Sequence, residues 1–491
     1  MPDWLAYRAA STPERVALVA GGTTWSFAQL DTAATRIAQR LTALGVRKGD
    51  RIATLMHNGP GAAALPHAAL RLGATVVPLN VRLSDPELAW MLEDAAPQLL
   101  LADERTLTRA AEVAGTRPNL ITATLDRDVV VPGVRDDASG TEESAPLHLA
   151  HDLDAVLAII YTSGTTGQPK GAMLTVGNFW WSAVGSALNL GTHADDRWLV
   201  CLPLFHVGGL SIVLRSAIYG IAAVVHDGFD ADAVNAEIDA GGATIVSVVA
   251  VMLQRLLDAR GDRRFPSTLR CVLLGGGPAP RPLLERCAAL RVPVVQTYGL
   301  TEACSQVATL APEDVLRRMG SAGRVLYPNE LRIAADGRGG SDRDGEILVR
   351  GPIVMAGYAG RPDATADAIV DGWLRTGDVG RLDADGYLYV LDRRDDLIVT
   401  GGENVYPAEV EDVILEHPAV DGCAVVGVAH ASSGESVKAY VVLAAGQTVD
   451  EDSIIAFCTE RLARYKCPEK IMFVDELPVG LGGKLLRRAL R

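Results

Sequence analysis

The sequence predicts an α/β fold: a large N-terminal domain of layered α/β sheets with a small β-subdomain, and an α+β domain at the C-terminus. Three observations lead to this prediction. Strand-like apolar runs alternate with helical segments through about the first 300 residues, which favours parallel sheets. From about residue 320 the segments become short and alternating, as in a small β-structure. The total of 491 residues is too long for a single core.

The first 150 residues carry clear helix and strand signals. Ser26 and Gln29 form a capping box at the start of a helix, and Gly45 is placed to end that helix. A βαβ unit follows, and its spacing requires a parallel sheet. Its predicted parts are a strand at residues 51–56, a helix at 61–72 and a strand at 75–79.

Residues 161–171 combine hydroxyl side chains, glycines and one lysine directly after an apolar run at residues 156–160. Glycines allow sharp turns and a close approach of the backbone to a ligand, and N–H groups and hydroxyls in such a turn form a nest for an anion. The common pattern G-x-x-x-x-G-K-[ST] is absent, because Pro169 precedes Lys170 and Gly171 follows it. A solvent-exposed linker would need neither the apolar run nor the lysine. We therefore predict a phosphate-binding loop.

Residues 208–219 form a predicted helix that is apolar nearly all round and should be buried. Arg215 is the exception, and a buried arginine needs a partner. The partner can be a carboxylate in a structural salt bridge, or the side chain can snorkel to water. The alternative is a counter-charge for an acidic substrate.

Two predicted strands, residues 271–274 and 294–297, each end in a glycine-rich turn, at residues 275–280 and 298–302. Turns beyond the carboxyl ends of parallel strands are where α/β sheets bind nucleotides. Glu302 could ligate Mg²⁺ there, although one glutamate considered by itself is more often a surface residue.

A charged cluster at residues 392–396 marks the predicted boundary between domains 1–394 and 395–491. A small β-subdomain precedes this cluster, with short strands expected at residues 346–350, 361–363, 372–378 and 386–391. After it, Pro407 suits the first turn of a helix. Strands at 423–428 and 437–443 and a helix at 450–465 should follow. Lys484 lies in a glycine-rich turn near the end, which on its own would be an ordinary basic tail.

Composition excludes several classes of protein. The 46 basic and 60 acidic residues give a net charge of −14, which makes the chain a poor general binder of nucleic acid. The seven cysteines are odd in number and scattered, so we expect neither disulfides nor a zinc site, and a reducing cytoplasm fits. We expect no signal peptide and no transmembrane helix.

Taken together, these segments resemble the adenylate-forming superfamily, which includes acyl-CoA synthetases, adenylation domains of peptide synthetases and luciferases. The resemblance covers nearly the whole chain, and six motifs occur in the order of the family. They lie at residues 161–171, 298–302, 376–378, 393–396, 401–407 and 484.

Within the superfamily, the chain is most similar to the o-succinylbenzoate–CoA ligases of menaquinone biosynthesis. The stretches that carry this similarity are residues 186–191, 202–211, 274–280, 298–306 and 391–398. Two positions depart from that pattern. Gly208 stands where serine is expected, and Thr400 stands where serine is usual.

The resemblance implies a two-step reaction. A carboxylate attacks the α-phosphorus of ATP to give an acyl-adenylate and pyrophosphate, and the thiol of coenzyme A then displaces AMP. Lys484 should contact the α-phosphate and the attacking carboxylate. After adenylation the C-terminal domain should rotate about Asp395 and bring in the thioester-forming loop Gly401, Gly402, Glu403 and Asn404.

The resemblance also assigns the remaining site residues. Those expected to hold the β- and γ-phosphates are Thr162, Ser163, Gly164, Thr165, Thr166 and Lys170. Those expected around the adenine and ribose are Gly275, Gly276, Gly277, Pro278, Tyr298, Gly299, Thr301, Asp378 and Arg393. Glu302 should hold Mg²⁺. The expected catalytic residues are Lys484, Thr162 and Glu302.

o-Succinylbenzoate keeps one ionised carboxylate while the other reacts, so its pocket needs a cation. Arg215 matches a basic position of this ligase and can bind a carboxylate with two hydrogen bonds. Further pocket candidates are His206, Ser211, Gly277 and Thr301. Apart from these small-molecule substrates we expect no nucleic-acid partner, and we expect a homo-oligomer.

Competing interpretations remain open at this point. The chain can be another aryl- or fatty-acyl-CoA ligase, or an adenylation enzyme that loads a carrier protein supplied as a separate chain. The motifs do not separate it from a luciferase-like oxygenase. A non-catalytic scaffold fits least, because every catalytic position is filled.

Overall fold

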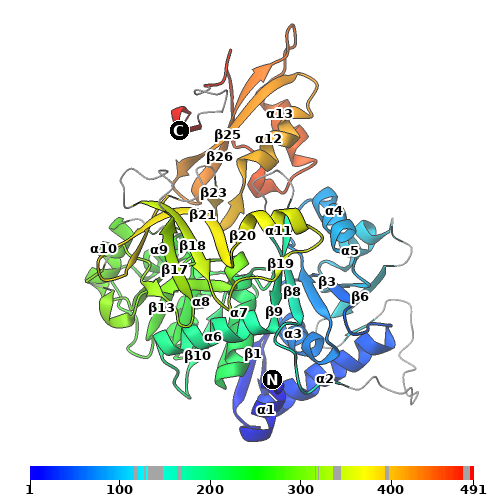
Figure 1. Cartoon of the computed structure of the whole chain (residues 1–491), viewed down its shortest axis with the longest axis vertical. Coiled ribbons are helices and arrows are strands. Elements are labelled where there is room, and N and C mark those ends of the chain that lie inside the picture. Colours follow the sequence, from blue (N-terminus) through cyan, green and yellow to red (C-terminus); the bar gives the residue numbers. More distant parts are fainter. Residues whose placement is uncertain are drawn as a thin grey trace. The chain divides into compact units, whose positions relative to one another are not determined.

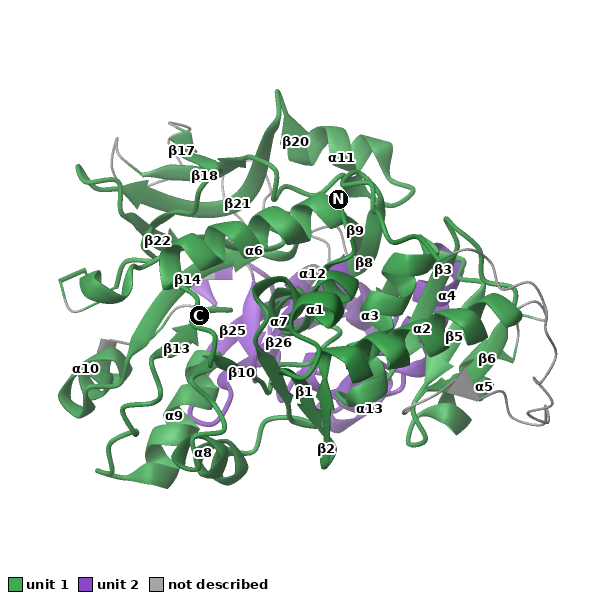
Figure 2. Ribbon diagram, turned by 90° about the horizontal axis from the view of Figure 1, so that it is seen from below, with its two compact units in different colours: residues 1–81, 95–160, 171–391 green, residues 82–94, 161–170, 392–491 purple. Residues whose placement is uncertain are grey.

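Figure 1 shows the computed structural model of the whole chain. The structure describes residues 1–115, 117, 120–125, 129–130, 147–162, 169–277, 279, 281–315, 317–318, 320–334, 344–392, 397–478 and 487–490. Unit 1 comprises residues 1–81, 95–160 and 171–391, and unit 2 comprises residues 82–94, 161–170 and 392–491 (Figure 2). The predicted boundary at 394–395 falls among residues 393–396, outside the described residues.

A nine-stranded sheet carries the predicted glycine-rich turn after β13, and its strand order is β16-β15-β14-β13-β12-β10-β11-β1-β2. The turn predicted at residues 298–302 begins three residues later than expected, because β14 continues to Leu300 and pairs with β15. The pairs from β14 to β1 are parallel, and antiparallel strands close both edges. The strands are β1 (Val16–Ala20), β2 (Thr23–Ser26), β10 (Arg197–Val200), β11 (Ala222–Val225), β12 (Ile245–Val248), β13 (Cys271–Leu274), β14 (Val294–Leu300), β15 (Ser305–Thr309) and β16 (Arg324–Val325).

An eight-stranded sheet contains the predicted βαβ unit, and its order is β19-β9-β8-β4-β3-β5-β6-β7. Strands β3 and β4 pair in parallel around α3, as the spacing predicted. The strands are β3 (Arg51–Leu55), β4 (Thr75–Pro78), β5 (Leu99–Ala102), β6 (Ile121–Leu125), β7 (Val129–Val130), β8 (Val156–Thr162), β9 (Lys170–Thr175) and β19 (Gly357–Tyr358).

The predicted β-subdomain is a five-stranded sheet of order β17-β18-β21-β20, with β22 paired to β21. Its strands are β17 (Glu330–Ala334), β18 (Gly345–Arg350), β20 (Ile369–Val370), β21 (Trp373–Leu382) and β22 (Leu388–Asp392). The strand predicted at residues 361–363 was wrong. These residues begin helix α11 (Pro362–Ala368), because Pro362 occupies the first helical position, where a missing N–H costs nothing.

The other helices alternate with the strands of the two large sheets. They are α1 (Trp4–Ser11), α2 (Phe27–Ala43), α3 (Pro60–Leu72), α5 (Leu107–Ala114), α6 (Val176–Leu190), α7 (Val207–Tyr219), α8 (Ala231–Asp239), α9 (Ala250–Arg260) and α10 (Arg281–Leu290), with short 3₁₀ turns η1 (Thr301–Ala303) and η2 (Pro312–Asp314). The predicted capping box of Ser26 and Gln29 is present at the start of α2. Among the described residues no helix is long and apolar enough to cross a membrane.

Unit 2 contains a five-stranded sheet of order β24-β23-β26-β25, with β27 paired to β26. Its elements are β23 (Ile398–Thr400), β24 (Glu403–Val405), β25 (Val420–His430), β26 (Gly434–Leu443), β27 (Lys470–Phe473), the helices α4 (Asp85–Ala95), α12 (Pro407–Leu415) and α13 (Glu451–Thr459), and the turns η3 (Arg464–Lys466) and η4 (Arg487–Ala489). Helix α13 ends six residues earlier than the predicted 465. The amide of Ala463 donates to Glu87 Oε2 at 2.8 Å, so the chain leaves the helix to bury Leu462 and Ala463.

Helix α3 buries eleven of its thirteen residues, including His67, whose two ring nitrogens have no hydrogen-bond partner in the part of the chain that the structure describes. Burial lowers the pKa of His67 from 6.5 to about 4. Between these two values the unfolded chain binds a proton that the folded chain does not, so acidification favours unfolding. The part of the free energy of unfolding that depends on a neutral His67 is complete above about pH 6.5, and it is lost as the pH falls towards 4.

We therefore expect His67→Leu to flatten the pH dependence of the free energy of unfolding between pH 6.5 and 4, measured by urea unfolding. The pKa difference corresponds to roughly 3 kcal/mol across this range. His193→Gln at an exposed position is the control and should follow the unmodified protein. An unchanged slope in His67→Leu would contradict the assignment.

The start of α7 contains two glycines with opposite requirements. A Cβ at Gly209 would lie 2.3 Å from the carbonyl oxygen of Pro203, whereas a Cβ at Gly208 would meet only Leu202 Cδ1, at 3.5 Å. Gly208 is the position where the resembling ligases suggest serine, and the space for that side chain exists. Gly209 lets the helix approach the 202–203 backbone closely.

Gly209→Ala should therefore destabilise the protein by about 1–3 kcal/mol, because backbone must move to relieve the contact. The matched variant Gly208→Ser should leave the urea midpoint within experimental error or raise it slightly, since serine is a better helix residue than glycine. Equal midpoints for the two variants would show that the contact at Gly209 is relieved at little cost.

Candidate active site

Arg215 lies inside unit 1 on helix α7, with 2% of its surface exposed. Its Nη2 donates a hydrogen bond to Ser182 Oγ at 2.8 Å, and its Cζ lies 5.8 Å from the ring centroid of Trp198. Its Nε is buried and has no hydrogen-bond partner among the residues that the structure describes. Burial lowers the pKa of Arg215, because taking the charge out of water disfavours the charged form.

No carboxylate in the described part of the chain forms an ion pair with Arg215, and its side chain is too buried to snorkel to water. Within the described residues, neither a salt bridge nor snorkelling accounts for its charge. The two nearby acidic groups cannot replace a carboxylate. Burial raises the pKa of the Cys304 thiol to about 12, and it also raises the pKa of Tyr219. Both groups are therefore neutral near pH 7, and the positive charge of Arg215 lacks a counter-charge in the described residues.

More buried polar groups without partners lie on the elements that pack around Arg215. Ser211 stands one turn before Arg215 on α7, and its Oγ has no hydrogen-bond partner among the described residues. Gln306 on strand β15 is 2% exposed, and within the same residues neither its amide oxygen nor its amide nitrogen has a partner. Helices α6 and α7 both contact β15. Buried polar groups are normally hydrogen-bonded, so these atoms indicate a polar ligand.

Tyr298 and Asp378 come from different sheets and meet in a buried pair. Tyr298 OH on β14 donates to Asp378 Oδ2 on β21 at 2.7 Å. The backbone N–H of Asp378 donates to Thr376 Oγ1, whose hydroxyl donates to the Ile347 carbonyl at 2.7 Å. The structure thus brings together two residues predicted for the nucleotide, and their contact with adenine and ribose remains a prediction.

Glu302 lies in the turn η1, directly after β14, and its Oε1 accepts a hydrogen bond from Tyr358 OH at 2.9 Å. The two residues after the turn, Cys304 and Ser305, have φ of 48° and 86°. No group of three or more potential metal ligands occurs in the described ranges. A single carboxylate still fits Mg²⁺, which is commonly held by one or two carboxylates together with substrate phosphates.

The predicted adenine turn follows β13 and lies beside the end of the parallel strand β14. A Cβ at Gly275 would lie 2.8 Å from Thr297 Cγ2. Gly276 has φ of 77°, a value that favours glycine. At Gly299 a Cβ would lie 1.5 Å from the carbonyl oxygen of Ser305, so this position of the β14–β15 pair requires glycine.

Several predicted residues lie outside the described residues: Ser163, Gly164, Thr165, Thr166, Pro278, Arg393, Asp395 and Lys484. The two ends of the phosphate loop are described. Strands β8 and β9 are neighbours in their sheet, and Thr162 Oγ1 donates to the Lys170 carbonyl at 3.4 Å. His206 is the N-cap residue of α7.

The predicted thioester-forming loop is the turn of a hairpin in unit 2. Gly401 and Gly402 connect β23 to β24, with φ of 58° and 88°. Positive φ at both central residues is the requirement of a type I′ hairpin turn. Glu403 is 4% exposed and accepts a hydrogen bond from Arg82 Nη1 at 2.9 Å, a partner that sequence reasoning missed.

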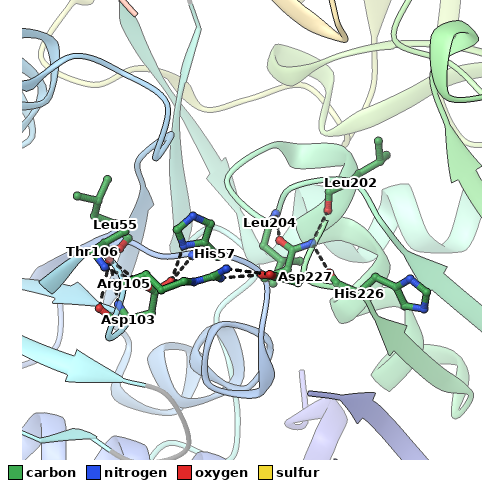
Figure 3. Close-up of polar contacts among 10 residues, drawn as sticks. Leu55, His57, Asp103, Arg105, Thr106, Leu202, Leu204, His226 and Asp227 are labelled. Atoms are coloured by element: carbon green, nitrogen blue, oxygen red, sulfur yellow. Dashed lines mark hydrogen bonds and ion pairs between the residues drawn. The ribbon is translucent and has the colours of Figure 1, made fainter. Parts of the chain in front are cut away.

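A cavity of about 250 Å³ lies in unit 1 beyond the ends of β3 and β5. None of the described residues that line it is a predicted site residue. His57 Nδ1 lies 2.7 Å from Asp103 Oδ2 in its wall, and Arg105 pairs with Asp227 (Figure 3). Burial by itself would raise the pKa of the Asp103 carboxyl, but hydrogen bonds from His57 and Thr106 outweigh this effect and lower the pKa.

Asn58 beside this cavity is a residue that sequence reasoning missed. Its Nδ2 donates to the carbonyls of Leu202 and His226 at 3.0 and 3.1 Å, and its Oδ1 accepts from the Leu204 amide at 2.9 Å. It thereby fixes the segment that leads to His206. The signal available in the sequence was an asparagine that lies between a strand and a helix beginning with Gly-Pro.

Comparisons with known proteins agree with the resemblance described from the sequence motifs. The family described as AMP-binding enzyme matches residues 5–359, and the AMP-binding enzyme C-terminal domain matches residues 409–484. A 2-succinylbenzoate–CoA ligase of Geobacillus kaustophilus is 51% identical over 492 residues, covering 100% of this chain and 97% of that protein.

Two solved structures of the o-succinylbenzoate CoA synthetase of Bacillus subtilis are each 43% identical and cover 100% of this chain and 98% of the other chain. A double mutant bound with the product analogue OSB-NCoA superimposes with a TM-score of 0.91. The complex with the acyl-adenylate intermediate OSB-AMP superimposes with a TM-score of 0.74.

Proposed function

Because this chain belongs to the family of AMP-binding enzymes, we propose that it is an AMP-forming acid–thiol ligase converting o-succinylbenzoate to o-succinylbenzoyl-CoA. The reaction runs through an acyl-adenylate and releases AMP and pyrophosphate, as a step of menaquinone biosynthesis. We place it in the cytoplasm, with ATP, Mg²⁺ and coenzyme A as its other reactants.

The observation that carries the choice of acid is the buried Arg215, which has no carboxylate partner among the described residues. An isolated buried charge is expensive, and a substrate carboxylate removes the cost when it binds. Guanidinium and carboxylate form short charge-assisted hydrogen bonds. Ser211 and Gln306 add polar atoms that a second carboxylate or the keto group can use.

The first half-reaction joins an anion to a polyanion, so the protein must place positive charge and donors where charge develops. We assign Lys484 to the α-phosphate and the attacking carboxylate. Residues 162–170 grip the departing pyrophosphate. Glu302, oriented by Tyr358, holds Mg²⁺, which neutralises the triphosphate when bound. Tyr298 and Asp378 orient the nucleoside.

In the second half-reaction the thiolate of coenzyme A attacks the acyl carbonyl carbon, and the bond to AMP breaks. We assign the site for this step to the hairpin turn Gly401–Gly402, with Asp395 as the hinge that exchanges it for Lys484. The hairpin has a defined shape, since Glu403 is buried and bonded to Arg82.

A panel of carboxylic acids in a pyrophosphate-release assay tests the proposal, with coenzyme A or a carrier protein as acceptor. o-Succinylbenzoate should give pyrophosphate and a CoA thioester, and aromatic or fatty monocarboxylic acids should react far more slowly. A monocarboxylic acid that reacts at least as well would replace the proposal by another acyl-CoA ligase. Transfer to the carrier protein alone would identify a loading enzyme.

A further inference from the structure

Ser182 on α6 stands between Arg215 and the turn that carries Glu302. It is 2% exposed, and its Oγ accepts the hydrogen bond from Arg215 Nη2 at 2.8 Å. The same Oγ donates to the carbonyl oxygen of Cys304 at 2.7 Å. A serine inside a helix commonly bonds back to the carbonyl four residues earlier, whereas this one bonds to residues 33 and 122 positions away.

The direction of these bonds is fixed by chemistry. A guanidinium can only donate, so Ser182 must accept from Arg215. Its single hydroxyl proton is then free for Cys304, whose carbonyl can only accept. The order is therefore Arg215 N–H to Ser182 O–H to the Cys304 carbonyl, and one lone pair of the serine is always turned towards the arginine.

The Cys304 end of this chain is held in place. Cys304 is fully buried and has φ of 48°, a left-handed value that is unfavourable for a non-glycine residue. Ser305 follows with φ of 86°. Such a backbone persists only where its surroundings fix it. The carbonyl of Cys304 is thus a fixed anchor for the hydroxyl of Ser182.

We infer that Ser182 is a positioning residue for the acid substrate: it aims Arg215 at the carboxylate that does not react. This inference rests on the proposed function, because Arg215 must contact that carboxylate. Arg215 has four rotatable side-chain bonds and no ion pair in the described part of the chain to hold it. The bond to Ser182 is the one directional contact that its Nη2 makes there.

Ser182→Ala should lower kcat/KM for o-succinylbenzoate about tenfold, the size of one hydrogen bond to a charged group. The loss should lie mainly in KM, since the carboxylate bound by Arg215 does not react. Two keto analogues each lack one carboxylate, 4-oxo-4-phenylbutanoate and 2-butyrylbenzoate. Whichever of them the unmodified enzyme activates should be used equally well by Ser182→Ala, since that acid has nothing for Arg215 to bind.

Two further variants distinguish the orientation of Arg215 by Ser182 from a general disturbance of the structure. In an Arg215→Leu background, Ser182→Ala should have no further effect on kcat/KM for o-succinylbenzoate, because the group it aims is gone. Ser216→Ala is the matched control, since Ser216 is equally buried and no hydrogen bond joins it to Arg215 in the described part of the chain. Should Ser182→Ala not fold, Ser182→Cys keeps the side-chain volume while weakening both hydrogen bonds.

Equal losses for the dicarboxylate and the monocarboxylate, or a full additional loss in the Arg215→Leu background, would overturn the inference and leave Ser182 a packing residue. Failure of the proposed function has a different signature, because the unmodified enzyme would then not convert o-succinylbenzoate at all. Normal conversion by the unmodified enzyme with no loss in Ser182→Ala rejects the role of Ser182 alone.

Discussion

Replacing Lys484 by alanine is expected to slow adenylation at least ~10²-fold, by analogy with the loss of one preorganised donor from a site where charge develops. Thioester formation from supplied acyl-adenylate and coenzyme A should change much less, because Lys484 is assigned to the first half-reaction only. Pyrophosphate release measures the first step. Conversion of synthetic acyl-adenylate to the CoA thioester measures the second.

Lys170→Ala is the useful comparison, since Lys170 is the other lysine of the proposed phosphate site. Its effect on adenylation should be smaller, because Lys170 is assigned to the leaving pyrophosphate rather than to the reacting α-phosphate. If Lys484→Ala damages both half-reactions equally, the proposed division of labour between Lys484 and the Gly401–Asn404 loop is wrong.

Arg215→Leu should lower kcat/KM for o-succinylbenzoate roughly 10- to 150-fold, which corresponds to the ~1.5–3 kcal/mol of a hydrogen bond to a charged group. The same change should leave the ligand-free protein equally stable or more stable. A buried charge without a counter-charge is costly, and an apolar side chain of similar reach removes that cost. Steady-state kinetics and urea unfolding of the same sample measure the two effects.

The opposite pair of results would mean that Arg215 is structural. Removing one partner of a buried salt bridge destabilises a protein by about 3–5 kcal/mol. A large loss of stability together with a change in kcat/KM within twofold would therefore place its partner within the protein and leave the acid pocket without an assigned cation.

The regular parts of the fold were predictable because local signals and tertiary structure agree. The capping box of Ser26 and Gln29, the βαβ unit around α3 and the apolar helix around Arg215 all follow from spacing alone. The end of α13 was not predictable. It depends on Glu87, a residue far away in the sequence, which accepts the amide hydrogen bond of Ala463.

The residues of the candidate site likewise include some that the sequence predicts and some that it does not. Glycines and hydroxyls next to a strand are visible in the sequence, so the turn at Gly275 was predicted, whereas Gly299 lies within strand β14 rather than in the predicted turn. Ser182 and Gln306 were missed because a single serine in an apolar helix and a glutamine in a strand carry no local signal. Their roles depend on their surroundings in the fold. Ser182 bonds to Arg215, and the buried amide of Gln306 has no hydrogen-bond partner among the described residues.

The bond sequence from Arg215 through Ser182 to Cys304 also limits how this pocket can be redesigned. A variant that accepts an apolar acid is not obtained by Arg215→Leu alone, because the polar atoms of Ser182, Ser211 and Gln306 would remain buried in the proposed acid pocket. These three residues would have to lose their polar atoms as well. A partial set of changes would still bind an apolar acid poorly, so the proposed preference for a dicarboxylate resists gradual change.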